Sequence, residues 1–369
     1  MPELKNPPKR IVILKPSALG DIAHSLPVLS ALRQLFPAAH LAWVVNRAYA
    51  PILEQHPDLD EIIQFDRAAM RKNFFTGMWQ FAHFLYHLRQ QRFDLAIDLQ
   101  GLFRTGAMTL ATGAPTRIGL ASAREGARYC YTHRIVDDIH TTHAVDRYWR
   151  VIESLVAARF HLADSIRQDG ILPPRSHEKT FHVPIDADAR AWALEQLQSY
   201  PRPWLAVGVG SRWLTKRWPP QHFASLVSRA LAQFGGTVIF VGTPDEADLA
   251  AQAASLVAGR ALQLTGKTSL PQLVALLSLA DVMIANDTGP LHLAVALGRP
   301  VVAPFTCTSI ARTGPYAQSD RAVSTTIWCR GSYLKTCARM ECMQELTPEK
   351  LWPPLESILR DLERRLHAA

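Results

Sequence analysis

Short apolar runs alternate with amphipathic segments along most of this 369-residue chain. After the first run, Ile22, Leu26 and Leu29 recur at a spacing that places them near one face of a helix. Strands that alternate with helices pair in parallel, and the helices cover the faces of the sheet. The runs that we expect to form strands are residues 11–14, 41–45, 62–65 and 95–99 in the first half, and 204–209, 237–241, 282–285 and 301–305 in the second.

The length of the chain favours two domains rather than one core. We expect an N-terminal domain over residues 1–180 and a second over 181–353, joined by a connection that contains one helix. A terminal helix near 354–366, within residues 354–369, is expected to pack back toward the first domain. The predicted fold class is α/β, with two Rossmann-like, doubly wound domains facing a central cleft. Ligands of such sheets bind beyond the carboxyl ends of the strands.

Composition limits the partners and the location of the protein. No run of about 18 apolar residues is present, so the sequence predicts no membrane-spanning helix. The polar N-terminus lacks the pattern of a signal peptide, which favours the cytoplasm. The net charge of +8 favours an anionic partner, either nucleic acid, phosphorylated lipid or acidic sugar, although solubility alone would also explain it.

The five cysteines do not suggest a disulfide scaffold in a chain of this size. Cys329, Cys337 and Cys342 lie close together in the sequence, beside basic residues. They include no Cys-x-x-Cys pair, and a fourth ligand is not evident. We therefore expect ordinary thiols rather than a zinc site.

The segment 286–292 is typical of a phosphate site. It follows an apolar run, and it opens a short helical pattern that ends at Gly298. The first amides of a helix lack internal partners, and the helix dipole favours an anion there. Gly289 would let the backbone approach a ligand closely, and Thr288 offers a hydroxyl. Alternatively, Asp287 or Thr288 simply caps the helix.

Two further loops follow predicted strands of the second domain. One carries Gly210, Ser211 and Lys216, and its glycine and lysine suit a diphosphate, although a solvated basic loop would look similar. The other carries Asp245 and Glu246. A carboxylate in that place could accept hydrogen bonds from a ribose, or it could only favour a helix N-terminus.

In the first domain, the loop after the first predicted strand carries Lys15, Ser17, Gly20 and Asp21. A carboxylate that faces the predicted cleft could take a proton from an attacking hydroxyl. The alternative is that Asp21 caps the helix that follows.

Residues 67–93 contain no acid and interleave basic with aromatic side chains. This composition suits a membrane surface, a phosphorylated amphiphile or single-stranded nucleic acid. It also suits a helix that buries its aromatic residues in the core. The basic residues are Arg67, Arg71, Lys72, Arg89 and Arg92, and a second basic cluster comprises Arg124, Arg128, His133 and Arg134.

Three stretches together resemble a known family. They are residues 15–27, residues 93–104, and residues 286–292 with Arg299-Pro300 behind them. The chain resembles the bacterial heptosyltransferases of glycosyltransferase family nine, which build the inner core of lipopolysaccharide. The resemblance implies a GT-B fold, a nucleotide-sugar on the C-terminal domain, an acceptor on the N-terminal domain, and inversion of the anomeric configuration. It also implies that no metal and no cofactor beyond the donor substrate are needed.

The same resemblance assigns roles to residues. Asp21 would be the general base for the acceptor hydroxyl. The donor would be ADP-heptose, held by Ser211, Lys216, Asp287, Thr288, Gly289 and His292. The acceptor, a phosphorylated glycolipid at the cytoplasmic face of the inner membrane, would meet Ser17, Gly20, Arg71, Lys72, Arg124 and Arg128.

Within the family, residues 123–125 and 131–134 are more similar to the heptosyltransferase I branch, which adds the first heptose to Kdo-lipid A. Two alternatives stay open. One is a family-nine transferase with another donor or core acceptor. The other is a non-catalytic module that binds nucleotide or nucleic acid, although the resemblance itself predicts no nucleic acid partner. A dehydrogenase is disfavoured, since no Gly-x-Gly-x-x-Gly follows the first predicted strand.

Overall fold

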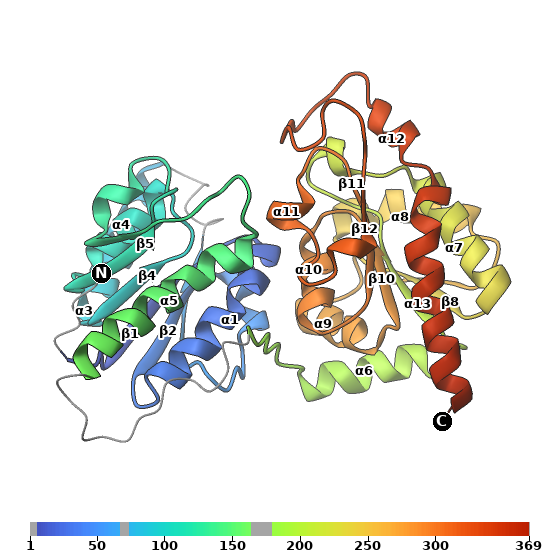
Figure 1. Cartoon of the computed structure of the whole chain (residues 1–369). Helices are drawn as coiled ribbons and strands as arrows, with labels where there is room; N and C mark the ends of the chain where they lie inside the picture. The colour runs from blue at the N-terminus through green and yellow to red at the C-terminus, as the bar shows by residue number, and fades with distance from the viewer. Residues whose placement is uncertain (1–5, 67–73, 164–178, 369) are drawn as a thin grey trace. The chain divides into compact units, whose positions relative to one another are not determined.

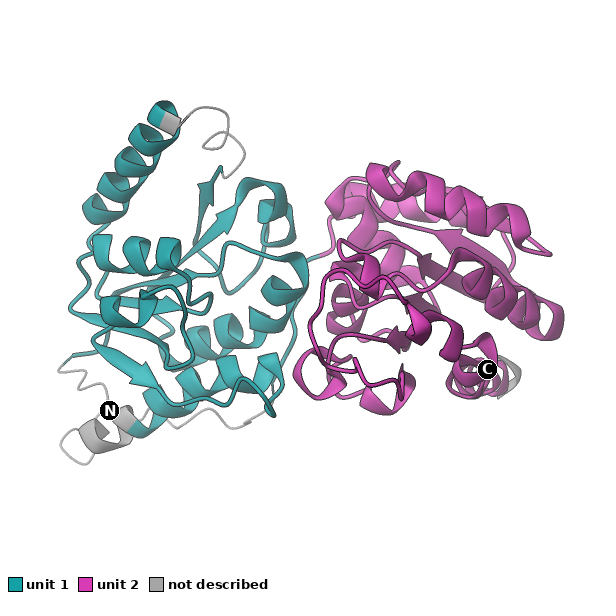
Figure 2. Cartoon of the chain, turned by 90° about the horizontal axis from the view of Figure 1, so that it is seen from above, with its two compact units in different colours: residues 1–184 teal, residues 185–369 magenta. Residues whose placement is uncertain are grey.

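The computed structural model describes residues 6–66, 74–163 and 179–368. The chain forms two compact units, Met1–Pro184 and Ile185–Ala369 (Figure 2). Each unit contains a six-stranded sheet in which all the strand pairs are parallel. The prediction of two doubly wound α/β domains is therefore confirmed.

The first sheet has the order β3-β2-β1-β4-β5-β6. Its central strand is completely buried apart from its first residue, as expected for a parallel strand covered on both faces. The strands are β1 (Arg10–Leu14), β2 (His40–Asn46), β3 (Glu61–Phe65), β4 (Leu95–Asp98), β5 (Thr116–Leu120) and β6 (His133–Ile135). The helices are α1 (Leu19–Leu35), η1 (Arg47–Ile52), α3 (Phe74–Gln90), α4 (Phe103–Ala111), η2 (Ala127–Cys130) and α5 (Ala144–Ala163) (Figure 1).

The second sheet has the order β12-β11-β10-β7-β8-β9. Its strands are β7 (Trp204–Gly208), β8 (Thr237–Phe240), β9 (Ala261–Gln263), β10 (Val282–Ala285), β11 (Val301–Phe305) and β12 (Ala322–Ser324). The longer helices are α6 (Ala187–Leu197), α7 (Pro220–Phe234), α8 (Ala247–Leu256), α9 (Leu270–Leu279), α10 (Gly289–Ala296) and α13 (Pro348–Ala368). The short ones are η3 (Leu214–Lys216), η4 (Pro244–Glu246), α11 (Ile310–Thr313), η5 (Ser319–Arg321) and α12 (Glu341–Glu345).

The terminal helix α13 differs from the sequence-based expectation. It begins at Pro348 rather than near Pro354, and it packs against α7 and β11 of its own unit (Figure 1). Leu351, Leu355 and Leu359 are buried in the same core cluster as the apolar face of α7. Residues at this spacing lie on one face of the helix, and this apolar face covers part of the second sheet. The prediction that the helix packs back toward the first domain stays a prediction.

The helix α3 has apolar residues on two faces. Phe81, Phe84 and Leu85 pack against the core cluster that contains buried Leu88, so the core-helix interpretation of this segment is correct for one face. The other face exposes four large apolar side chains: Phe75 at 75%, Met78 at 57%, Trp79 at 68% and Tyr86 at 64%. No helix in the described ranges, α3 included, is both long and apolar enough to cross a bilayer.

His56 is expected to make the stability of the first unit depend on pH. Its side chain is 3% exposed, and its Nδ1 accepts a hydrogen bond from the Asp58 amide at 3.1 Å. Burial lowers the pKa of His56 to about 4, although nearby Asp58 opposes the shift. In the unfolded chain the pKa of a histidine is about 6.5, so between about pH 6.5 and pH 4 the unfolded state binds more protons than the folded state. The free energy of unfolding is therefore unaffected by His56 above about pH 6.5, and it falls by about 2–3 kcal/mol as the pH falls toward 4.

Chemical denaturation of the protein and of His56→Asn, between pH 7.5 and pH 4.5, tests this expectation. An asparagine keeps an acceptor for the Asp58 amide but does not titrate, so the variant should lose less stability on acidification. His87→Asn, at an exposed position of α3, is the matched control. Equal pH dependence of the protein and His56→Asn would contradict the assignment.

Candidate functional site

Both sheets contain a point where the strand order reverses. In the second unit this point lies between β7 and β10, because the chain leaves β7 toward β8 and leaves β10 toward β11. Loops that diverge in this way open a crevice at the carboxyl ends of the two strands, where ligands of doubly wound sheets bind. The loop after β7 carries Ser211, and the loop after β10 carries Asp287 and Thr288.

Asp287 is the centre of a buried ionic cluster in that position. Its side chain is 5% exposed; Oδ2 accepts from Lys216 Nζ at 2.7 Å, and Oδ1 contacts His292 Nε2 at 3.0 Å. Burial by itself would raise the pKa of the Asp287 carboxyl. The hydrogen bond from His292 and the charge of Lys216 outweigh that effect and hold the pKa well below its usual range. Asp287 and His292 belong to one short segment, and the fold brings Lys216 to them from 71 residues away.

Asn286 ties the two loops together. Its Nδ2 donates to the carbonyls of Val209 at 2.8 Å and Gly210 at 3.3 Å, and its Oδ1 accepts from the Trp218 amide at 3.0 Å. The side chain is completely buried, so each of these bonds satisfies a backbone group that water does not reach. This residue fixes the spacing between the two loops, and sequence reasoning gave it no role.

The helix α10 follows directly. Thr288 is its N-cap residue, yet within the described part of the chain its hydroxyl bonds no amide of the helix. The Asp287 carboxylate bonds to Lys216 and His292 instead. Simple capping therefore does not explain this segment. The helix begins at Gly289, with Pro290 in its first turn.

Glu246 packs against the loops that follow β7 and β8. Its Oε2 accepts from the Thr243 amide at 2.9 Å. Its carboxyl group packs so closely on the backbone of Gly210 and Gly242 that a Cβ built there would lie 1.9 Å and 2.6 Å from its atoms. The glycines at the ends of β7 and β8 thus make room for a carboxylate. Of the two acids that the sequence left open, Glu246 rather than Asp245 is the one with these contacts.

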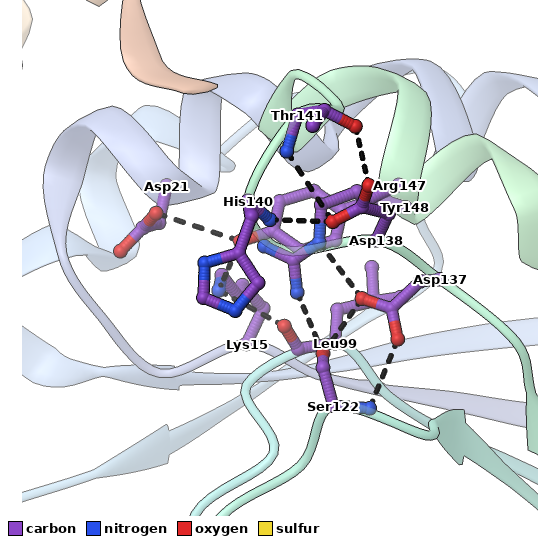
Figure 3. Close-up of polar contacts among 10 residues, drawn as sticks. All are labelled: Lys15, Asp21, Leu99, Ser122, Asp137, Asp138, His140, Thr141, Arg147 and Tyr148. Carbon is purple, nitrogen blue, oxygen red and sulfur yellow. Dashed lines mark hydrogen bonds and ion pairs between the residues drawn. The ribbon is translucent and has the colours of Figure 1, made fainter. Parts of the chain in front are cut away.

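In the first unit the strand order reverses between β1 and β4, and the loop after β1 leads to Asp21. Asp21 lies in the first turn of α1 and is half-buried, and its Oδ2 accepts from the Ala18 amide at 3.2 Å. The capping alternative is thus correct for one carboxylate oxygen. The other oxygen, Oδ1, lies 3.5 Å from the hydroxyl of Tyr148 on α5 (Figure 3). Ser17 is half-buried in the same loop, and Gly20 is buried in the first turn of α1.

Lys15 lies behind this carboxylate. It is 2% exposed, and its Nζ donates to the Leu99 carbonyl at 3.0 Å and to the Tyr148 hydroxyl at 2.8 Å (Figure 3). Asp98, at the end of β4, is fully buried as well; it accepts from the Gln100 and Gly101 amides and from Tyr131. Burial raises the pKa of Asp98, although these hydrogen bonds act in the opposite direction. Sequence reasoning missed Tyr148, because nothing marks a tyrosine 127 residues after Asp21 as its neighbour.

The basic residues expected to meet an acceptor are only partly described. Arg71 and Lys72 lie outside the described residues. Arg124 and Arg128 are exposed near η2. Arg128 donates to the hydroxyl of exposed Tyr129 at 2.9 Å, and the Arg134 guanidinium lies 5.8 Å from the centre of the same ring. An exposed cationic and aromatic surface therefore exists on this unit.

The cysteine-rich segment forms a small apolar cluster of its own. Cys329, Cys342 and Met343 are buried together, with Ile327 and Met340 packed against them. Burial, with Cys329 adjacent, raises the pKa of the Cys342 thiol to about 12. Within residues 6–66, 74–163 and 179–368, no group of three or more His, Cys, Asp and Glu side chains has an arrangement that could hold a metal ion.

The chain matches the model of glycosyltransferase family 9 (heptosyltransferase) over residues 81–343. Lipopolysaccharide core heptosyltransferase OpsX of Haemophilus influenzae is 26% identical over 328 residues, which cover 88% of this chain and 86% of the relative. Lipopolysaccharide heptosyltransferase 1 of Pseudomonas aeruginosa is 27% identical over 372 residues, 95% of this chain and 98% of the relative. Lipopolysaccharide heptosyltransferase 2 of Escherichia coli K12 is 25% identical over 85% of this chain and 87% of the relative.

Solved structures show the same fold. A family 9 glycosyltransferase from Veillonella parvula has a TM-score of 0.76 at 23% identity, covering 96% of this chain and 97% of the other. The E. coli heptosyltransferase WaaC with ADP has a TM-score of 0.70 at 23% identity, covering 95% and 99%. These likenesses confirm the GT-B fold that the resemblance implied. Since the family model matches well over half of its residues, the chain belongs to glycosyltransferase family 9, the heptosyltransferase family, and is an enzyme.

Proposed function

We propose that this enzyme transfers heptose from ADP-heptose to the Kdo-lipid A inner core of lipopolysaccharide, with inversion at the anomeric carbon. The observation that carries the proposal is the buried Asp287–Lys216–His292 cluster at the point where the second sheet reverses its strand order. The names of the relatives, which include heptosyltransferases 1 and 2, support the substrate class. A solved relative with ADP supports the nucleotide.

In this proposal the second unit holds the donor. Lys216 and the first amides of α10 stabilise the diphosphate as it leaves, so the reaction needs no metal. Thr288, Gly289 and Ser211 line the same loops, and Glu246 accepts hydrogen bonds from the ribose. Asp287 contacts the donor sugar and holds Lys216 and His292 in place.

The first unit supplies the base. The Asp21 carboxylate takes the proton of the acceptor hydroxyl, whose oxygen forms the new bond to the anomeric carbon while the bond to the diphosphate breaks. The half-buried position of Asp21 supports this role, because the carboxylate reaches solvent on one side and protein donors on the other. The proton ends on Asp21, and the electron pair of the broken bond leaves with ADP.

The acceptor is a phosphorylated glycolipid, which places the enzyme on the cytoplasmic surface of the inner membrane. The exposed apolar face of α3, a helix with no acidic residue, supports this location. Arg124 and Arg128 offer charge for the acidic groups of the acceptor, together with Ser17 and Gly20. Arg71 and Lys72 precede α3 in the sequence and belong to the same proposal.

A transfer assay tests the proposal. Release of ADP from ADP-heptose should require Kdo-lipid A and should persist in EDTA. UDP-, GDP- and dTDP-sugars should not release UDP, GDP or dTDP under the same conditions. Nuclear magnetic resonance of the product should show the anomeric configuration opposite to that of the donor. Retention of configuration, or loss of activity in EDTA with rescue by a divalent cation, would contradict the mechanism.

The second candidate is a family 9 transferase with another core acceptor, favoured by the match to heptosyltransferase 2. Acceptor-dependent ADP release with Kdo-lipid A that already carries one heptose, and none with Kdo-lipid A, would select it.

Vesicle co-sedimentation tests the membrane location. The protein should sediment with vesicles that contain anionic phospholipid, and Trp79→Ser should weaken this binding about tenfold, because it removes a large apolar side chain from the exposed face. Trp328→Ser, which replaces an equally exposed tryptophan of the second unit (66%, against 68% for Trp79), is the matched control. Equal loss in both variants, or no loss in Trp79→Ser, would contradict a role for α3.

A further inference from the structure

The two oxygens of Asp21 have different partners. Oδ2 accepts from the Ala18 amide, which belongs to the local turn. Oδ1 faces the hydroxyl of Tyr148, which comes from the distant helix α5 (Figure 3). A carboxylate held through both oxygens cannot rotate freely, so its lone pairs keep one direction.

Tyr148 is itself anchored by a buried cation. Lys15 Nζ donates to its hydroxyl oxygen at 2.8 Å, and the ammonium also lies 4.6 Å from the centre of the tyrosine ring. Since the hydroxyl oxygen accepts from Lys15, the single hydroxyl proton of Tyr148 is available for Asp21. The direction of the bonds is therefore set: Lys15 donates to Tyr148, and Tyr148 donates to Asp21.

The protonation states agree with this direction. Burial alone would lower the pKa of Lys15, but Asp21 and Tyr148 raise it above its ordinary value, so the side chain stays an ammonium. Burial raises the pKa of Tyr148 against the effect of Lys15, so the phenol keeps its proton.

We propose that Tyr148, anchored by Lys15, is a positioning residue for Asp21: its hydroxyl donates to one carboxylate oxygen and keeps the carboxylate aimed in one direction. The inference rests on the proposed role of Asp21 as the base. Neither Tyr148 nor Lys15 takes up the proton of the acceptor, which ends on Asp21. Their contribution is the orientation of the carboxylate.

Other charged groups lie around Lys15, Tyr148 and Asp21. On the side of β4, Asp98 interacts electrostatically with Lys15, and from α5 Arg147 interacts with Tyr148. Arg147 is held by Asp137 at 2.8 Å, so its charge is compensated locally (Figure 3). His24 of α1 packs against His143, with ring centres 5.2 Å apart. Substitution of Tyr148 leaves all of these groups in place, so a changed pH profile reports the lost hydroxyl.

The test is the pH profile of the transfer reaction in Tyr148→Phe. Loss of the donor to the ionised carboxylate should move the acidic limb of kcat/KM upward by about 0.5–1 pH unit. On the plateau, kcat should fall about tenfold, because the carboxylate is less well oriented. KM for both substrates should stay within about twofold, since Tyr148 is 5% exposed and lies behind Asp21.

Tyr131→Phe is the matched control. It also removes the hydroxyl of a buried tyrosine that donates to an aspartate of this unit, Asp98 Oδ2 at 2.8 Å. A general loss of stability would affect both variants alike, whereas only Tyr148→Phe should shift the pH limb. An unshifted limb in Tyr148→Phe, or equal shifts in both variants, would overturn the proposal.

Lys15→Met is the second variant. It replaces the buried cation with an apolar side chain of similar length, so kcat should fall. The thermal midpoint should fall as well, because the Leu99 carbonyl loses its buried donor. The acidic limb should move in the same direction as in Tyr148→Phe. An unchanged kcat in a folded Lys15→Met protein would show that Lys15 is not needed to hold Tyr148 in place. If Asp21→Asn were fully active, the proposed base would fail; if it were inactive and the limb of Tyr148→Phe did not move, only the present inference would fail.

Discussion

Asp21→Asn is expected to reduce kcat by about 10²–10⁴-fold, the usual contribution of a positioned general base. The amide oxygen can still accept from the Ala18 amide, so the turn at the start of α1 should persist. An amide does not take a proton at neutral pH, however, and the acceptor hydroxyl then attacks without deprotonation. Initial rates of ADP release at saturating donor and acceptor measure the effect.

Asp58→Asn provides the comparison for Asp21→Asn, because Asp58 accepts from Ser30 of the same helix at 2.7 Å and has no role in the proposed reaction. ADP should bind Asp21→Asn as tightly as the unaltered protein in calorimetry, since the donor loops belong to the other unit. A folded Asp21→Asn enzyme with more than a tenth of the original kcat would rule out Asp21 as the base.

Lys216→Met is expected to reduce kcat by about 10²–10³-fold, comparable to the loss of one donor to a developing negative charge. The ammonium donates to Oδ2 of Asp287 at 2.7 Å and to the Asp287 carbonyl at 3.4 Å, and it is the cation proposed to stabilise the departing diphosphate. Its removal also leaves buried Asp287 with His292 as its remaining partner in this cluster. A moderate loss of stability should accompany the loss of activity, because a buried carboxylate then lacks its cation.

Lys335→Met separates these effects from a general loss of charge. Lys335 is exposed and lies 5.4 Å from the centre of the Trp213 ring, which Lys216 approaches at 4.8 Å. It shares an aromatic neighbour with Lys216, but among the contacts of the described residues none joins it to Asp287. Activity close to normal in Lys335→Met, with the loss confined to Lys216→Met, is the expected outcome. Similar rates in both variants would contradict the role of Lys216.

Local pattern predicted some elements of the fold better than others. Buried runs such as residues 11–14 and 282–285 were recognised as strands because every residue is apolar, as parallel pairing inside two helical layers requires. The edge strands β6, β9 and β12 were missed, since each has three residues and none is fully buried. β5 was missed because Thr116, Arg117 and Gly119 interrupt its apolar pattern. These strands form because a neighbouring strand supplies hydrogen-bond partners for their backbone.

The candidate site was predictable where a motif is contiguous. The strand, turn and helix around Asp287, Thr288 and Gly289 lie within a few residues, and the structure has them in that order. Glycine at 289 and proline at 290 favour a helix start, so this segment defines its own geometry. Lys216 was proposed from the pattern of its own loop and from the resemblance. Its pairing with Asp287 was not predicted, because a separation of 71 residues carries no local signal.

The sequence by itself determined the layers of this protein: repeated apolar runs and amphipathic helices admit only covered parallel sheets. It also determined the turn between β10 and α10, whose conformation depends on adjacent residues. Only the tertiary structure decided that Tyr148 and Lys15 meet behind Asp21, that Glu246 rather than Asp245 packs on the glycine loops, and that α13 covers its own sheet. The physical reason is that backbone pattern is local, whereas burial and charge pairing depend on which segments the strand order brings together.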